Sequence, residues 1–310
     1  TAAFVALCLV SCQTTSPTET GGDIYDVYFL GGQSNMEGFG YVSELPSTLN
    51  SPVDDAMIFM GRNVADGEAG GGVGIWSPLQ PGFGFESEAD GVQNKLSNRF
   101  GPELTFASHM KTLNPKRRIA IIKYSRGGTG LHVDASGYGS WDPDYDKGNG
   151  RNQYDNAVTA ISSAMAQRDI DGDGFADTLI PKGIVWMQGE ADAYDSLPAV
   201  QSYEANLSRL MGLIRAEFSS PTLPVAIGKI KDSGDTVETR VMTYSPDIQQ
   251  AQEGYTKSDS CAALVTKTEN FSFLDDGWHY VSSDYVKLGR AFSETIYALQ
   301  GRCGSGEEAA

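Results

Sequence analysis

The chain has 310 residues, which is enough for one large α/β domain or two small ones. Hydrophobic residues make up 40% of the chain and charged residues 20%, a composition that argues against an intrinsically disordered or membrane-spanning protein. The 40 acidic residues outnumber the 23 basic ones, and the net charge of −17 repels polyanions. Nucleic acid is therefore excluded as a partner, and we expect a neutral substrate or one held by local groups.

The first 12 residues, TAAFVALCLVSC, form an apolar run that is too short to span a bilayer. The run ends in LVSC at residues 9–12, which resembles a bacterial lipobox. We therefore expect residues 1–12 to be a lipoprotein-type signal segment with a truncated start and a lipidated Cys12; a stray apolar terminus is the alternative. Residues 13–22, QTTSPTETGG, are typical of a flexible tether. The sequence thus predicts an extracytoplasmic protein, lipid-anchored in a bacterial cell envelope, that touches the membrane only through Cys12.

Residues 23–301 alternate between apolar runs typical of buried strands and segments with helical spacing, and residues 302–310 form a C-terminal tail. We expect strands at Val27–Leu30, Met57–Met60, Arg118–Tyr124, Ile180–Met187, Leu223–Ile230 and Ala262–Thr266. We expect helices at Pro102–Leu113, Asn152–Arg168, Val200–Phe218, Asp247–Tyr255 and Val286–Leu299. This alternation predicts one α/β domain with a mostly parallel sheet covered by helices on both faces.

Three of the predicted strands end in polar or glycine-containing motifs: GGQSN at residues 31–35, SRGGT at 125–129 and QGEAD at 188–192. The carboxyl ends of parallel strands meet at one edge of the sheet, and open α/β sheets bind ligands there. Residues 41–90 are rich in Gly, Pro, Asp and Ser and predict a long loop region with one strand. Long irregular segments in compact domains are often functional, so we expect this one to wall a substrate cleft.

The residues for ester hydrolysis come from these motifs and from FLDDGWHY at 273–280. The reaction needs a nucleophile, a base and donors for the developing oxyanion. Ser34 fits the nucleophile, and His279 fits the base because imidazole titrates near neutrality. Asp276 would hold the imidazole tautomer, with the adjacent Asp275 as the alternative. The candidate oxyanion donors are the backbone N–H groups of Ser34 and of Gly127 or Gly128, and the side-chain amide of Gln188.

Four ordered blocks resemble the SGNH-type (GDSL-like) hydrolases, in the branch that contains sialate O-acetylesterases and carbohydrate esterase family six acetylxylan esterases. GGQSNMEG at residues 31–38 resembles the first block, which carries the nucleophile Ser34. GGT at 127–129 resembles the second, where a glycine N–H enters the oxyanion hole. WMQGEAD at 186–192 resembles the third, with Gln188 in place of the asparagine of other SGNH enzymes. DDGWHY at 275–280 resembles the last, with Asp276 and His279.

The resemblance covers roughly Asp23 to Leu299, and FGPE at residues 100–103 is also similar to the branch. It implies a flavodoxin-like three-layer α/β/α sandwich, the SGNH hydrolase fold. The G-x-S-x-G motif of the α/β-hydrolases is absent around Ser34. Arg126 before the glycines and Trp278 between the aspartate and the histidine depart from the branch's pattern, and the sequence offers no interpretation of either.

Other polar and aromatic residues have simpler explanations than catalysis. Glu190 and Asp192 look like a glycosidase carboxylate pair, but two residues apart after a strand we expect them to brace loops. His109 lies among helix residues, and we expect His132 to be a surface-loop residue. Trp141 is either a sugar-stacking platform or a packed loop aromatic.

The segment DIDGDGFAD at residues 169–177 has a carboxylate at alternating positions and then turns at a glycine, as an EF-hand-type loop does. The twelfth position, where a bidentate Glu is expected, is Ile180, so another group must close the site. We predict a structural calcium site, with a solvated acidic turn as the alternative, and no cofactor for catalysis. The ligands would be Asp169, Asp171, Asp173, the carbonyl of Phe175, and Asp177.

Cys261 and Cys303 lie outside the signal segment and are able to pair in an exported protein, but spacing alone leaves the pairing open. The whole pattern predicts a serine esterase that removes O-acetyl groups from a carbohydrate, either a polysaccharide such as xylan or sialic acid. One alternative is a carbohydrate-binding surface protein with a vestigial hydrolase fold. Another is a lipase or thioesterase of the broader SGNH group.

Overall fold

The structure is a computed structural model, and it describes residues 21–145 and 150–303. The predicted signal segment with Cys12, most of the predicted tether and residues 304–310 of the predicted tail lie outside the described residues. Within the described ranges, no helix is both long enough and apolar enough to cross a membrane.

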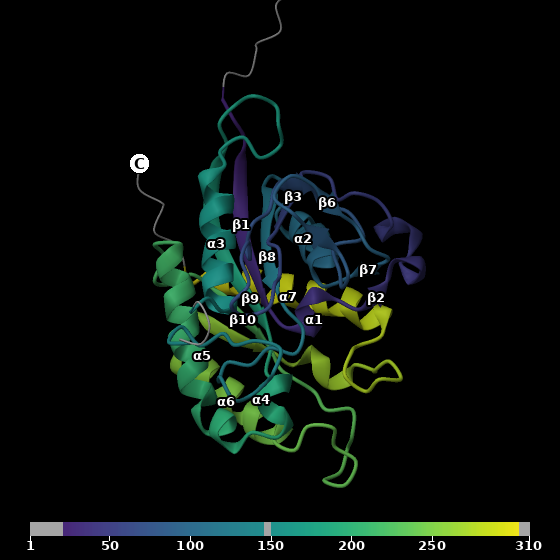
Figure 1. Ribbon diagram of the computed structural model, residues 1–310. Coiled ribbons are helices and arrows are strands. Elements are labelled where there is room, and N and C mark those ends of the chain that lie inside the picture. Colours follow the sequence, from purple (N-terminus) through teal and green to yellow (C-terminus); the bar gives the residue numbers. More distant parts are fainter. Residues whose placement is uncertain (1–20, 146–149, 304–310) are drawn as a thin grey trace, which may run out of the picture.

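The main sheet consists of β1 (Ile24–Gly32), β3 (Ala56–Met60), β4 (Trp76–Pro78), β8 (Arg118–Ser125), β9 (Thr178–Met187), β10 (Val225–Gly228) and β11 (Ala262–Val265). The strand order is β11-β10-β9-β1-β8-β3-β4, so the first strand of the chain lies at the centre (Figure 1). Neighbouring strands are parallel except β4, which pairs antiparallel with β3 at the edge. The predicted mostly parallel sheet is confirmed.

Helices cover both faces of this sheet. The helices are α1 (Ser34–Glu37), α2 (Glu103–Leu113), α3 (Gln153–Ala166), α4 (Glu190–Tyr194), α5 (Leu197–Glu217), α6 (Ser245–Ser258) and α7 (Ser282–Gln300). On one face α2 and α7 pack against each other, while α3, α5 and α6 run along the other (Figure 1). This is the predicted three-layer α/β/α sandwich.

The segment between β1 and α2 is more structured than the sequence indicated. Besides the predicted strand at β3 it contains β4 and two small antiparallel pairs, in which β2 (Gly40–Tyr41) joins β7 (Arg99–Phe100) and β5 (Glu88–Ala89) joins β6 (Asn94–Lys95). Short 3₁₀ turns occur at Val42–Glu44 and Ser47–Leu49, and a third at Thr266–Asn270. Strands of two or three residues carry too little periodicity to be read from a sequence.

β1 is a strand because its residues from Tyr25 to Leu30 are apolar, aromatic or β-branched apart from Asp26, and both of its faces are buried. It ends at Gly32, whose φ of +143° is open to glycine alone in practice. A Cβ at Gly32 would also lie 1.9 Å from the carbonyl oxygen of Met187 on β9. The glycine therefore lets the chain turn tightly against β9 and present the next residues at the carboxyl edge of the sheet.

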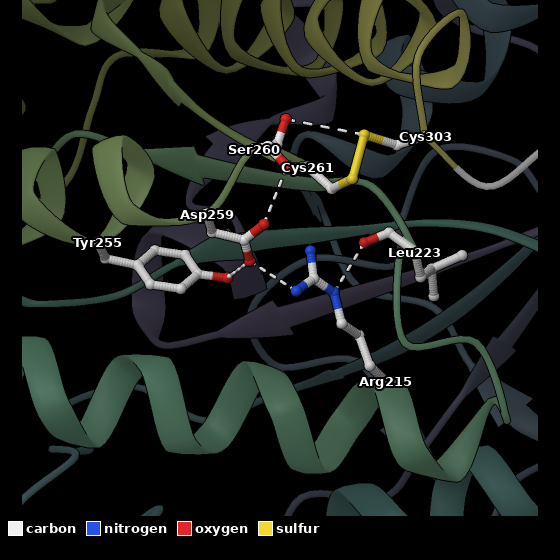
Figure 2. The surroundings of a disulfide bond; sticks show 7 residues. All are labelled: Arg215, Leu223, Tyr255, Asp259, Ser260, Cys261 and Cys303. Carbon is white, nitrogen blue, oxygen red and sulfur yellow. Dashed lines mark hydrogen bonds and ion pairs between the residues drawn. A yellow bond between two sulfur atoms is a disulfide. The ribbon is translucent and has the colours of Figure 1, made fainter.

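Cys261 and Cys303 form a disulfide, with their Cα atoms 5.7 Å apart (Figure 2). Cys261 directly precedes β11 and Cys303 follows the end of α7, so the bond joins the edge strand to the last helix. Asp259 lies beside it, accepting the N–H of Cys261 at 2.8 Å and pairing with Arg215 at 2.6 Å (Figure 2). The pairing that the sequence left open is present at the amino end of β11, opposite the edge that carries the motifs.

Candidate active site

A cavity of about 790 Å³ opens at the carboxyl ends of the central strands. Its lining includes Ser34 after β1, Gly127 and Gly128 after β8, and His279 from the loop before α7. The sheet thus brings together at one edge the motifs that are far apart in the sequence, as expected for a parallel α/β fold.

Ser34 is the first residue of α1, a single helical turn that starts immediately after β1. The N–H of Gln33 donates to the carbonyl of Met187 at 2.9 Å, which ties the turn to β9. The N–H of Gly38 closes the helix on the carbonyl of Ser34 at 2.9 Å, with a φ of +96° that favours glycine. The serine is 9% exposed and faces the cavity from this braced turn.

The carboxylate of Asp276 organises the loop that carries His279. Its Oδ2 lies 2.7 Å from the histidine Nδ1, and its Oδ1 accepts the backbone N–H groups of Trp278 at 2.8 Å and His279 at 3.0 Å. Among the described residues, His279 finds its carboxylate partner in Asp276 and not in the alternative, Asp275. Because Nδ1 is committed to Asp276, Nε2 is left as the nitrogen able to accept a proton.

Burial lowers the pKa of His279 below its ordinary value, although the Asp276 carboxylate acts in the opposite direction. For Asp276, burial acts to raise the pKa, but the hydrogen bonds from His279 and from the backbone outweigh it and hold the pKa below its usual range. At neutral pH the pair therefore consists of a neutral imidazole and a carboxylate, which is the combination that general-base catalysis requires.

Two aromatic rings that the sequence analysis did not identify fix the orientation of the imidazole. Phe39 stacks on His279 with ring centroids 3.6 Å apart and planes within 4°, and Phe85 stacks in turn on Phe39 with ring centroids 4.3 Å apart. Both phenylalanines line the cavity. This apolar contact removes water from the ring and is the structural source of the burial that lowers the histidine pKa.

Gly127 lies next to Ser34. A Cβ at this position would lie 3.3 Å from the Cβ of Ser34 and 2.8 Å from Oε2 of Glu37. Only a glycine lets the backbone of this loop approach Ser34 so closely. Gly128, the alternative, has a φ of +70° and is covered by the ring of Tyr138. The structure thus brings Gly127, more directly than Gly128, to the side of Ser34.

Gln188 does not have the predicted role of an oxyanion donor. Its side chain is fully buried, and its Nε2 donates to the carbonyl of Thr129 at 3.1 Å and to Oδ2 of Asp192 at 2.6 Å. Among the described residues, those that line the cavity do not include Gln188. Because both amide hydrogens are used inside the protein, the side chain is not available to an oxyanion; it holds the Gly127–Thr129 loop against α4.

Glu190 and Asp192 brace loops, as expected. Asp192 accepts the N–H of Leu131 at 2.9 Å and that of His132 at 3.1 Å, and burial raises its pKa to about 6. Oε1 of Glu190 accepts the side-chain amide of Asn35 at 2.8 Å. Neither carboxylate lines the cavity in the part of the chain that the structure describes, so the arrangement is not a glycosidase pair.

Asn35 is a further residue that the sequence analysis did not single out. Its Nδ2 donates to Glu190 and, at 3.1 Å, to the carbonyl of Trp278, while its Oδ1 accepts the hydroxyl of Tyr285 at 2.7 Å. The residue after Ser34 is therefore hydrogen-bonded to the residue before His279. This bridge fixes the segments that carry Ser34 and His279 relative to each other.

The chain resembles known proteins in sequence and in fold. A family model described as carbohydrate esterase, sialic acid-specific acetylesterase, matches residues 24–298. The chain belongs to this family. A probable carbohydrate esterase from Arabidopsis thaliana is 26% identical over 113 residues, a match that covers 36% of this chain and only 39% of the plant protein.

Solved structures share the fold of this carbohydrate esterase. The Arabidopsis protein superimposes with a TM-score of 0.60 at 19% identity, covering 88% of this chain and 98% of its own. A carbohydrate acetylesterase from Xanthomonas citri gives 0.57 at 16% identity, covering 88% and 56%, and NanS gives 0.56 at 16% identity, covering 90% and 98%. The resemblance to the SGNH-type carbohydrate esterases and the predicted fold are confirmed.

The sequence analysis considered Trp141 as a sugar-stacking residue, but other aromatic residues line the cavity. Trp141 is 1% exposed, and its Nε1 donates to Oγ1 of Thr129 at 2.8 Å, so it is a packed loop aromatic. Tyr138, Tyr194 and Trp278 line the cavity instead. Trp278, an unexplained departure in the sequence, lies with its ring centroid 5.7 Å from that of Tyr194 at the cavity wall. Rings of this kind are suited to the apolar faces of sugars.

Neither of the other histidines of the esterase contributes to this cavity. His132 lies on the neighbouring loop, where its Nδ1 accepts the N–H of Asp134 at 3.1 Å. His109 lies on α2 and approaches Glu294 at 3.3 Å. Within the described residues, His279 is thus the histidine of the cavity.

The acidic loop of the esterase turns at Gly172 and Gly174, both with positive φ. Oxygen atoms of Asp169, Asp171 and Asp173 lie within 4.8 Å of one another, and a second such group joins Asp171 to Asp177 and to Asp23, a residue the sequence analysis did not include. Both carboxylate oxygens of the buried Asp177 accept backbone N–H groups, from Asp23 at 2.9 Å and Ile170 at 2.8 Å. The donor set is all oxygen, as a calcium ion requires, while Asp177 already has a structural role.

Proposed function

We propose that the protein is a serine esterase that removes O-acetyl groups from a carbohydrate with Ser34, His279 and Asp276. The observation that carries the proposal is that Ser34 and His279 line one cavity while Asp276 holds the Nδ1 of that histidine at 2.7 Å. Family membership supports the ester and the carbohydrate, and the aromatic lining of the cavity supports a sugar ring as the group that carries the acetyl.

In this mechanism Ser34 Oγ attacks the acetyl carbonyl carbon while Nε2 of His279 takes the serine proton. The negative charge on the carbonyl oxygen is stabilised by the backbone N–H of Ser34 and by that of Gly127, which in the absence of substrate donates to the carboxyl group of Glu37. The imidazolium then gives its proton to the departing sugar hydroxyl as the C–O bond breaks. Water repeats the cycle on the acetyl-enzyme and releases acetate. Gln188 enters this scheme as a positioning residue for the Gly127 loop, in place of its predicted direct role.

The experiment that tests this function measures acetate release from acetylated xylan and from O-acetylated sialic acid, with Ser34→Ala as the control. Release from one substrate, lost in the variant, supports the serine mechanism and identifies the sugar. If Ser34→Ala released acetate from a small activated ester at the wild-type rate, the mechanism would be wrong. Binding of glycans without turnover of any acetyl ester would favour a carbohydrate-binding protein instead.

A structural calcium ion in the acidic loop is a separate proposal, supported by the spacing of Asp169, Asp171 and Asp173 and by their mutual proximity. The backbone carbonyl of Phe175, and Asp177 or Asp23, would complete the oxygen ligands. An ion that binds only the folded state raises the melting temperature in proportion to its affinity. We expect calcium to raise the melting temperature of the wild type and not of Asp171→Asn/Asp173→Asn; an equal shift in both would contradict the site.

Lipidation at Cys12 and a location in the cell envelope are also proposed, on the strength of the LVSC motif at residues 9–12. Metabolic labelling of the expressed full chain with a radioactive fatty acid tests this. Label in the wild type and none in Cys12→Ala is the expected result, and label in neither would contradict the anchor.

A further inference from the structure

A second cavity of about 360 Å³ adjoins the active-site cavity. Its lining includes Arg62, Ser87 and Glu88, from the segment between β1 and α2. Two residues, Glu37 and Asn63, line both cavities, so they form the shared wall between them. The segment predicted to wall a substrate cleft therefore contributes to a second cavity that shares a wall with the first.

The shared wall is a hydrogen-bonded carboxyl–amide pair. Nδ2 of Asn63 donates to Oε1 of Glu37 at 2.6 Å and to the carbonyl of Ser125 at 3.1 Å. Glu37 is the last residue of the nucleophile helix, three residues after Ser34, and its Oε2 borders Gly127. Both amide hydrogens of Asn63 are thus used inside the protein, so Oδ1 of Asn63 and the carboxyl group of Glu37 are left to accept hydrogen bonds from the hydroxyls of a sugar.

The chemistry of the second cavity differs from that of the first. The active-site cavity carries the rings of Phe39, Tyr138 and Trp278, whereas most of the residues around the second cavity are polar or charged and stand beside the apolar Met60, Phe83 and Ala89. Its charged residues are Glu37, Arg62, Glu88, Asp90 and Lys123. The ammonium of Lys123 forms a buried ion pair with Glu103 at 2.7 Å, and Glu88 pairs with Lys95 at 3.2 Å. Arg62 lines the cavity together with Glu37 and Asp90. Such a hollow has no excess of positive charge to attract an anionic ligand, and it offers several hydrogen-bonding partners to a neutral polyol.

We propose that this second cavity binds a neutral sugar unit attached to the unit that carries the acetyl group. The ligand class is thus an acetylated neutral oligosaccharide or polysaccharide, with the ester at Ser34 and the next unit past Glu37 and Asn63. The inference rests on the proposed esterase function and extends it to substrate length. The active-site cavity, of about 790 Å³, would hold the acetylated unit against its aromatic rings. The second cavity, of about 360 Å³, would hold one further sugar unit.

The test uses Ser34→Ala, which removes turnover so that binding is measured alone. Mono-O-acetylated xylose, xylobiose and xylotriose are titrated against it by calorimetry. We expect the dissociation constant to fall about 10-fold or more from one unit to two, because several hydrogen bonds are added, each worth roughly 2- to 10-fold. Xylotriose should add little beyond xylobiose, since the second cavity holds one unit.

The second cavity is then altered with Arg62→Ala and Glu88→Ala in the Ser34→Ala background; both side chains are exposed, so the fold is expected to be retained, and melting temperatures verify it. Each change should reduce the gain from xylose to xylobiose several-fold. The matched control is Arg290→Ala, an exposed arginine on α7 outside both cavities, which should leave the gain unchanged.

The second sugar site would be overturned by equal affinities for xylose and xylobiose, or by no binding of either. It would also be overturned if the gain in affinity from xylose to xylobiose survived in both variants. Acetate release by the wild-type chain from a small activated ester separates this outcome from a failure of the esterase function. Ser34-dependent release without a chain-length effect keeps the esterase and rejects the second site. A chain-length effect without any release keeps the second site and rejects the esterase.

Discussion

At the scale of single residues, the site depends on Asp276, whose two oxygens hold both the imidazole and the backbone of the loop that carries it. The neighbouring Asp275 has the same charge and lies one residue further from His279. The two aspartates therefore form a natural matched pair for testing whether charge or geometry supports catalysis.

Asp276→Asn should lower kcat for a small activated acetate by on the order of 10³- to 10⁴-fold, because the amide no longer holds the imidazole tautomer that leaves Nε2 free. Asp275→Asn keeps the Asp276–His279 contact and should change kcat by less than about 2-fold. Steady-state kinetics on both purified variants measures the difference. Comparable losses in the two variants would show that the charge of the loop, and not the contact at Nδ1, matters.

A second titrating residue lies close to the nucleophile. Burial raises the pKa of Glu37 to about 7, although Lys123 and the neighbouring hydrogen bonds act to lower it. The base, His279, has a pKa below its ordinary 6.5. Below about pH 7 Glu37 is protonated and neutral, and the lowered pKa of His279 makes its imidazole able to accept a proton at a lower pH than that at which Glu37 ionises.

We therefore expect kcat/KM to rise with pH along a limb below about 6.5 and to fall again above about 7. The fall has an electrostatic cause, since an ionised Glu37 beside Gly127 opposes the negative charge that develops on the acetyl oxygen. In Glu37→Gln the upper limb should disappear and the lower limb remain, because the amide no longer ionises while His279 still titrates. A pH series on an activated acetate measures this; a Gln variant that keeps the upper limb would contradict the role of Glu37.

The residues that could be predicted from sequence are those whose signal is local. Asp276 and His279 are three positions apart, and Ser34 follows a strand directly, so spacing and strand ends identify them. Gln188 also follows a strand, but whether its amide faces the cavity or the interior is decided by Thr129, nearly sixty residues earlier in the chain. Phe39, Phe85 and Asn63 escaped notice for the same reason, because their roles come from contacts between distant segments.

At the scale of elements, the alternation of strands and helices predicted the parallel sheet and its two helical layers. The alternation did not predict the order of the strands in the sheet, because the neighbours of β1 are β8 and β9, which come much later in the chain. The disulfide also depends on contacts between distant segments. Cys261 and Cys303 are 42 residues apart and meet only because α7 packs back over β9, β10 and β11.

Reducing this disulfide should lower the free energy of unfolding by about 2–4 kcal/mol, because it frees a 42-residue loop in the unfolded chain. The bond lies at the amino end of β11, opposite the edge with Ser34, so kcat at moderate temperature should stay unchanged. Urea unfolding with and without reductant measures the stability. In Cys261→Ser/Cys303→Ser the reductant should have no effect. An unchanged midpoint for the reduced wild type would show that the bond contributes no stability.

At the scale of the whole molecule, the net charge of −17 surrounds a cavity that itself contains few charges. Arg126 is the cation of that cavity, and it lies near Glu37, while Glu88 and Asp90 face the adjoining hollow. The negative charge of the whole molecule and the acidic groups of the second cavity therefore have the same effect on the choice of substrate. Both favour an uncharged acetylated chain over an acidic one, and the field acts at a distance that depends on salt.

Ionic strength should therefore separate the two kinds of substrate. At about 0.01 M salt the field reaches some 30 Å and repels an acidic acetylated polysaccharide such as O-acetylated pectin, whereas at about 0.15 M it is screened within roughly 8 Å. We expect kcat/KM for acetylated pectin to rise several-fold over this range, and that for acetylated xylan without uronic acid branches to change less than about 2-fold. A small neutral activated acetate, followed under the same conditions, controls for effects of salt on the catalytic step. If the acidic and neutral polymers responded equally, the charge of the molecule would have no part in selecting its substrate, and the preference would rest on contacts inside the cavities alone.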